Sequence, residues 1–356
     1  MAKYNINDFT ILTDSGGRTL IAESVIYEDT FTVTNTIDNL PTSYFTDYFA
    51  TPYVFQGSTS GYASGGEGAP SSPYTMSNVI DKFPFASDAN ATDVGDLTQA
   101  RIQVTGQSSQ NHGYTSGGTA QPPYSNPYSS NIIDKFPFSS DANATDVGDL
   151  TQGRRAQGGG QSSSTHGYTA GGGHAFNDHD NVIDKFSVSS DGNATDVGDL
   201  TQARTGVGQS SASDGYTSGA STPPTEPLSN VIDKFPFASD ANATDYGDLT
   251  EARHSLSSNS SSSNGYTTGG FSPSARNTIE KFPFASSANA SDVGDLTSAR
   301  GRMAGQNSTS NGYVSGGTPA SGKLDIIEKY PFASDANAAD VGDLTHTREN
   351  LAGQQV

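Results

Sequence analysis

The sequence repeats itself six times, and this internal period constrains the fold more than any other feature. A block that runs NVIDKFPFASDANATDVGDLTQAR starts at Asn78 and returns five times in related form. A second block, related to GYTSGG, alternates with it and first appears at Gly61–Gly66. The lysines of the first block lie 47 to 53 residues apart, at Lys82, Lys135, Lys185, Lys234, Lys281 and Lys329. Such a period indicates a repeat architecture in which each unit packs on its neighbours.

Each repeat is expected to form four short strands. No helical period fits, whereas β-branched and aromatic residues alternate with turn-forming Gly, Asn, Asp and Ser. We assign strand a to the segment around Gly106-Gln107, strand b to GYTSGG, strand c to VIDKFPF and strand d to DVGDLT. Four strands at this period predict an all-β, six-bladed β-propeller over residues 56–356, with a β-solenoid as the alternative. Residues 1–55 lack the repeat and are expected to form a small β-rich N-terminal arm that docks the chain.

Strand c predicts how neighbouring blades contact one another. Side chains alternate along a strand, so Val79, Phe83 and Phe85 share one face. We expect these side chains to fill the gaps between blades, together with Leu97 and Tyr62. Asp81 and Lys82 should point to opposite faces. Ion pairing of such residues with the arginine after strand d of a neighbouring blade is expected.

The C-terminal tail offers a way to close the ring. Gly353-Gln354 matches strand a of other repeats but has no strand b after it. We expect it to pair with Gly61–Gly66, because closure removes free sheet edges. In a competing assignment, Tyr53–Ser58 supplies strand a of the first blade locally.

The repeat resembles the kelch repeat over about residues 55–356. The residues that carry this likeness in the first copy are Tyr62, Gly65, Gly66, Phe83, Phe85 and Arg101. The chain has no tryptophan, so the kelch tryptophan after the turn is absent and Val94 stands near its place. The sequence segment KFPFASDANATDVGDLT also resembles repeats in structural proteins of marine bacteriophages and other aquatic viruses. This second resemblance implies a virion location and a tail or appendage role, and it carries no catalytic residue.

Composition and motifs narrow the function classes. The net charge is −20 and the 18 basic residues are spread out, so nucleic acid is not an expected partner. There is no cysteine, and no run of 18 apolar residues predicts a membrane span. The first residues lack the apolar stretch of a secretory signal. No Ser-His-Asp arrangement, phosphate loop or nucleotide fingerprint is visible, so we do not expect an enzyme or an organic cofactor.

The turn between strands c and d is a candidate calcium site. Asp88, Asn90, Asp93 and Asp96 supply oxygen ligands at short spacing, as Ca²⁺ prefers. In the fifth copy Ser287 replaces the first aspartate. The alternative is a metal-free turn in which Asp and Asn side chains bond to their own backbone. His174 and His179, with Asp178 and Asp180, form a second candidate metal site that can equally be a solvated loop.

The connections between strands b and c are the candidate binding surface. They vary from 6 to 12 residues and should share one face of the propeller with the d–a connections. Loops on a rigid scaffold commonly carry binding, and aromatic rings can stack on sugars or anchor a protein. The candidate rings are Tyr74, Tyr124, Tyr128, Phe176 and Phe271. Alternatively, these rings fold back onto the blades.

These observations lead to a functional expectation. We expect a virion structural protein that attaches to a host-surface glycan or protein and contacts other virion proteins through residues 1–55. A cellular kelch-type scaffold for protein interactions is the alternative, and a glycan-cleaving propeller enzyme is a third possibility.

Overall fold

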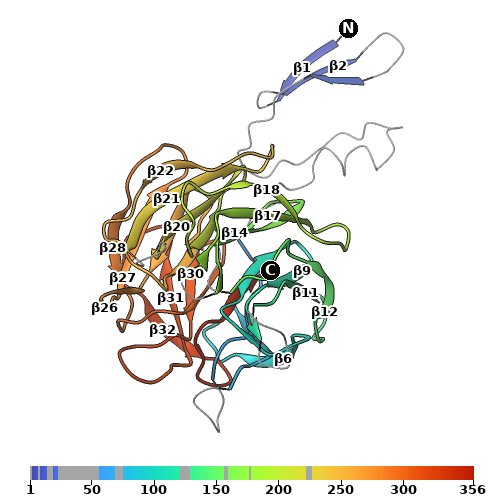
Figure 1. Ribbon diagram of the computed structural model, residues 1–356. Coiled ribbons are helices and arrows are strands. Elements are labelled where there is room, and N and C mark those ends of the chain that lie inside the picture. The colour runs from blue at the N-terminus through green and yellow to red at the C-terminus, as the bar shows by residue number, and fades with distance from the viewer. Residues whose placement is uncertain are drawn as a thin grey trace. The chain divides into compact units, whose positions relative to one another are not determined.

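The computed structural model divides the chain into two compact units, Met1–Thr51 and Pro52–Val356. The structure describes residues 2–6, 9–13, 19–22, 56–68, 75–120, 129–155, 159–175, 178–221 and 227–356. In the first unit, β1 (Ala2–Ile6), β2 (Phe9–Thr13) and β3 (Thr19–Ala22) form an antiparallel sheet in the order β1-β2-β3. The second unit is a six-bladed β-propeller (Figure 1). The described part of the chain contains no helix that could cross a membrane.

Each blade is a four-stranded antiparallel sheet in the order a-b-c-d. In blades one to six, strand a is β33 (Ala352–Gln355), β8 (Thr105–Ser108), β13 (Gly159–Ser162), β19 (Val207–Ser210), β23 (Ser257–Ser260) and β29 (Ala304–Asn307). Strand b is β4 (Ser60–Ser64), β9 (His112–Ser116), β14 (His166–Ala170), β20 (Asp214–Ser221), β24 (Asn264–Thr268) and β30 (Asn311–Ser315). Neighbouring a strands contact one another in a closed circle, so they line the axis.

The outer half of each blade consists of strands c and d. Strand c is β5 (Val79–Pro84), β11 (Ile132–Pro137), β17 (Val182–Ser187), β21 (Leu228–Pro236), β27 (Thr278–Pro283) and β31 (Ile326–Pro331). Strand d is β6 (Thr92–Asp96), β12 (Thr145–Asp149), β18 (Thr195–Asp199), β22 (Thr244–Asp248), β28 (Ser291–Asp295) and β32 (Ala339–Asp343). The strands are antiparallel, so the a–b and c–d turns share one face. The b–c and d–a connections share the opposite face. We call the first of these faces the turn face and the second the loop face.

The C-terminal strand closes the ring. Strand β33 pairs with β4, with Gln354 opposite Tyr62. In Figure 1 the C-terminus lies close to β9 of blade two, the blade that follows the one completed by β33. This is the closure expected from Gly353-Gln354. The competing assignment is wrong in its described part, because Gly57 bonds instead to Asn307 and forms a bridge with Ser308 of blade six.

Aromatic side chains fill the spaces between blades, as the alternation in strand c predicts. Tyr62 of blade one packs on Phe136 and Phe138 of blade two, with ring centroids 5.5 and 4.9 Å apart. On its other side, Phe83 packs on Tyr313 of blade six at 5.6 Å. Burying a side chain of this size contributes roughly 1.5–3 kcal/mol. The six interfaces together therefore form the core of the propeller.

The first described residues of the propeller unit, Gln56 and Gly57, lie close to the axis at the turn face. Gln56 is 8 % exposed, and its Nε2 donates to the carbonyl oxygen of Ser260 at 3.1 Å. Gly57 N donates to the carbonyl oxygen of Asn307 at 2.7 Å. Ser260 and Asn307 are the last residues of a strands, at the end that leads into the a–b turn. Gln56 and Gly57 therefore lie on the side of the propeller opposite the b–c loops.

Candidate functional site

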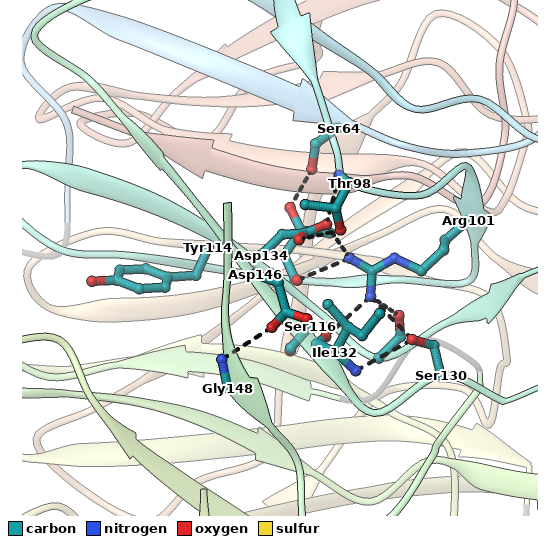
Figure 2. Close-up of polar contacts among 12 residues, drawn as sticks. Ser64, Thr98, Arg101, Tyr114, Ser116, Ser130, Ile132, Asp134, Asp146 and Gly148 are labelled. Atoms are coloured by element: carbon teal, nitrogen blue, oxygen red, sulfur yellow. Dashed lines mark hydrogen bonds and ion pairs between the residues drawn. The ribbon is translucent and has the colours of Figure 1, made fainter. Parts of the chain in front are cut away.

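A buried ion pair links each blade to the next. Figure 2 shows the guanidinium of Arg101, at the end of blade one, directed at Asp134 in β11 of blade two. Arg101 Nη2 lies 2.6 Å from Asp134 Oδ2, and both side chains are fully buried. Thr98 Oγ1 donates to the second carboxylate oxygen at 2.6 Å. Arg101 Nη1 also donates to the carbonyl oxygens of Gly117 and Ile132. The carboxylate is thus held by two residues of the preceding blade.

This pairing recurs at all six junctions and confirms the expected role of the arginines. The pairs are Arg101–Asp134, Arg154–Asp184, Arg204–Asp233, Arg253–Glu280, Arg300–Glu328 and Arg348–Asp81. Burial lowers the pKa of Arg101, and the adjacent Asp134 carboxylate acts in the opposite direction. Each carboxylate is paired with the arginine of the preceding blade. The acid opposite Asp134 in the sheet register, Asp146 of strand d, accepts a hydrogen bond from Gly148 N. The arrangement therefore joins neighbouring blades of the ring.

A second set of junction contacts comes from the amide side chains of the a strands. Gln107 Nε2 donates to the carbonyl oxygen of Tyr168 in the next blade at 3.0 Å, and to Thr169 Oγ1. The equivalent donors to strand b of the next blade are Gln161, Gln209, Asn259, Gln306 and Gln354. Sequence reasoning did not assign these amides, although a glutamine after glycine recurs in most repeats.

The axis of the propeller is narrow. A cavity of about 80 Å³ there is lined by all six a strands, and none of its described lining residues is Asp, Glu or His. Glycines keep it narrow: a β-carbon on Gly106 would lie only 2.2 Å from the carbonyl oxygen of Gly353. The same close approach occurs at Gly160, Gly208, Gly305 and Gly353. Ser258 occupies the sixth position and donates its hydroxyl to the Gly208 carbonyl oxygen at 2.8 Å.

The candidate calcium turn forms structural contacts with blade six and blade two. Asp88 pairs with Lys329 at 2.6 Å, and Asn90 Oδ1 accepts a hydrogen bond from Asp343 N. Asp93 Oδ1 accepts from Gly95 N within the same strand. The Asp96 carbonyl oxygen accepts from Ala144 N. Within the part of the chain that the structure describes, no three or more His, Asp or Glu side chains are grouped to hold a metal. Calcium binding at this turn stays a prediction.

The c–d turns also protect the outer edge of each blade. The turn of blade two donates from Ala144 N to Asp96 and accepts from Asp96 N through Asn143 Oδ1, and the other junctions repeat these bonds. An unpaired strand edge would be a template for aggregation. The turns therefore cover strand d where no further strand follows.

On the loop face, Phe271 packs against its neighbours. Its ring stacks on the imidazole of His254 with centroids 5.6 Å apart, and the Arg302 guanidinium lies 5.9 Å from the same ring. Phe271 is half-buried. For this residue the structure agrees with the alternative in which the ring folds onto the blade. The other candidate rings, Tyr74, Tyr124, Tyr128 and Phe176, lie outside the described residues.

In the candidate histidine metal site of blade three, the His174 side chain contacts other protein groups. His174 Nε2 lies 2.6 Å from Asp180 Oδ2, and Nδ1 lies 2.7 Å from the carbonyl oxygen of Gly153. A histidine binds a metal through a free ring nitrogen. Both nitrogens of His174 have protein partners. Metal binding by this loop stays a prediction.

A comparison with protein families finds no matching family model, and a comparison with curated proteins finds no matching protein. The six-bladed β-propeller is therefore established by the structure alone. The resemblances to the kelch repeat and to viral repeats are not confirmed by these comparisons.

Proposed function

We propose that this chain is a non-enzymatic structural protein of a virus particle, a tail or appendage component that attaches to a host surface. Its variable b–c loops contact a host glycan or protein, and residues 1–55 dock it onto other particle proteins. We propose a location in a virus particle because the repeat sequence resembles repeats of viral structural proteins. The alternative is a cellular kelch-type scaffold.

One observation carries the binding part of this proposal. The residues that recur in every repeat form the contacts between neighbouring blades. They are the arginine and its acid partner, the a-strand amide and the aromatic rings. The residues that differ between repeats are concentrated in the b–c connections of the loop face. A rigid ring that presents unlike loops on one face is a common arrangement for recognition.

The position of the first described residues of the propeller unit supports a division of roles between its two faces. Gln56 and Gly57 lie at the turn face, close to the axis. The b–c loops lie at the opposite face.

The described residues that line the axial cavity include no acidic group, and this is one reason for proposing a non-enzymatic role. A glycan-cleaving enzyme would need two converging carboxylates. The buried acids of the described blades each face an arginine instead, as Asp134 faces Arg101.

The loop face is tested by replacing Tyr124 and Tyr128 of blade two with alanine. Binding of the purified chain to a printed glycan array and adsorption to intact host cells are measured. We expect a loss of at least tenfold, because aromatic anchors dominate such interfaces. Asp146→Asn, in the same blade but on the turn face, is the matched control and should leave binding unchanged. Unchanged binding of the tyrosine variant would overturn the assignment of this face.

The docking role is tested by cross-linking through Lys3, the only lysine among residues 1–55. Mass spectrometry of cross-linked material identifies the partner. Cross-links to particle proteins support the proposal. Cross-links confined to cellular proteins would favour the cellular scaffold instead.

A further inference from the structure

The exposed c–d turns contain a repeated chemical motif that the proposed function does not use. An asparagine followed two positions later by Thr or Ser, with no proline between, is the acceptor sequence for N-linked glycosylation. Five c–d turns carry it, at Asn90, Asn143, Asn193, Asn242 and Asn289. The sixth turn has the same asparagine, Asn337, but Ala339 replaces the hydroxyl residue.

The hydrogen bonding of these asparagines leaves the reactive atom free. Asn143 is exposed, and its Oδ1 accepts a hydrogen bond from Asp96 N at 3.1 Å. The equivalent bonds at Asn90, Asn193, Asn242 and Asn289 also use Oδ1. In the described part of the chain, none of these five side chains donates a hydrogen bond through Nδ2. A substituent on Nδ2 would therefore leave the junction contact intact.

We propose that the c–d turns are acceptor sites for N-linked oligosaccharides, which would decorate the outer rim of the turn face. The donor is an oligosaccharide activated as a polyprenyl diphosphate. The Nδ2 atom forms a bond to the anomeric carbon of the sugar, and the bond between that carbon and the diphosphate oxygen breaks. One Nδ2 proton is lost, and the polyprenyl diphosphate leaves.

Two further asparagines provide a contrast within the same chain. Asn259 and Asn307 also belong to acceptor sequences, but they lie in a strands and are 1 % and 2 % exposed. Asn259 Nδ2 donates to the carbonyl oxygens of Gln306 and Tyr313 at 2.8 and 3.0 Å. In the folded chain these two residues cannot react, whereas the five turn residues can.

The turns also differ in the residue two positions before the asparagine. It is an aspartate in the first four turns, for example Asp88 before Asn90, and Ser287 before Asn289. Oligosaccharyltransferases of the bacterial type require an acidic residue at this place, whereas the eukaryotic type does not. A bacterial-type enzyme should therefore modify four turns, and a eukaryotic-type enzyme should modify five.

The acceptor sequences are confined to one side of the molecule. No b–c or d–a connection of the propeller contains one. Oligosaccharides on the c–d turns would therefore leave the loop face uncovered.

The test uses the purified full chain, a purified bacterial-type oligosaccharyltransferase and a polyprenyl-diphosphate oligosaccharide. Intact mass and glycopeptide sequencing report occupancy. We expect additions at Asn90, Asn143, Asn193 and Asn242 and none at Asn259 or Asn307. No addition to these turns, under conditions in which a short DANAT peptide is modified, would overturn the proposal.

A gain-of-site variant gives the sharper control. Ala339→Thr restores the acceptor sequence in the sixth turn, where Asp335 already supplies the acidic residue. Threonine occupies this place in the first four turns, so the variant should fold with an unchanged melting temperature. We expect one additional oligosaccharide, at Asn337. Modification of Asn337 in the unaltered chain, or its absence in the variant when the other turns react, would contradict recognition of this motif.

Discussion

The guanidinium of Arg348, at the end of blade six, donates to the carboxylate of Asp81 in blade one, 267 positions earlier in the sequence. Both side chains are fully buried. The same contact joins the other five pairs of neighbouring blades. The junction that closes the ring is therefore built like the internal ones, although it joins the two ends of the propeller unit.

Arg348→Met should strongly destabilise the propeller. It leaves the Asp81 carboxylate buried without its cation, which typically costs about 3–5 kcal/mol. The free energy of unfolding from a urea titration measures this loss. Lys329→Met is the control, because Lys329 pairs with a largely exposed Asp88 and such pairs contribute less than about 1 kcal/mol. Equal losses in the two variants would contradict a special role for the buried pair.

Gly106→Ala tests the close packing of the a strands. The added methyl group would lie 2.2 Å from the backbone oxygen of Gly353, which no side-chain movement can relieve. We expect a loss of about 1–3 kcal/mol or more in the free energy of unfolding. Ser258→Ala alters the same ring without adding a β-carbon and should cost about 1 kcal/mol for the lost hydrogen bond to Gly208. A neutral Gly106→Ala would show that the strands can separate.

Removal of Ala352–Val356 should open the ring. Strand β4 would lose its partner and expose an unpaired edge, which favours aggregation. Size-exclusion chromatography and thermal unfolding followed by circular dichroism measure the effect. A synthetic AGQQV peptide should restore the melting temperature in a concentration-dependent way. A peptide with Gln354→Ala should bind more weakly, because it lacks the amide that donates to Tyr114 of blade two. A truncated chain as stable as the intact one would refute closure by β33.

Stability should fall at alkaline pH. Burial raises the pKa of Tyr62, Tyr114 and Tyr313 to about 12 in the folded chain, compared with about 10 when exposed. The folded state therefore retains these protons more strongly, and stability is complete below pH 10 and lost as pH rises towards 12. Melting temperatures between pH 8 and 12 test this expectation. Tyr62→Phe should reduce the alkaline fall, and an unchanged fall would assign it to other groups.

Much of the architecture could be predicted from the sequence because one unit is written six times. The strand order, the ring closure through Gly353-Gln354 and the Arg101-type ion pairs all follow from residues that recur at fixed places. Alternation along strand c also placed Phe83 and Phe85 between blades. The sequence analysis did not predict the burial of Ile80, which is completely buried on the other face of the same strand.

The contacts that sequence reasoning missed depend on distances between blades. Nothing in the order of residues shows that Gln107 reaches the backbone of Tyr168, 61 positions later. Likewise, the need for Gly106 comes from the backbone of Gly353, which approaches only when the ring is closed. Among the candidate rings of the loop face, Phe271 lies within the described residues, and its packing on His254 could not be predicted from a variable segment.

The six junctions differ in detail but share one set of complementary parts. Glu280 and Glu328 replace aspartate in two blades and still meet their arginines. A blade taken from one place in the ring would therefore find suitable neighbours at another. Unequal recombination between repeats could add, remove or exchange a whole blade, together with its loop, without requiring a new interface to evolve. Diversity on the loop face can thus arise by shuffling intact units as well as by point mutation.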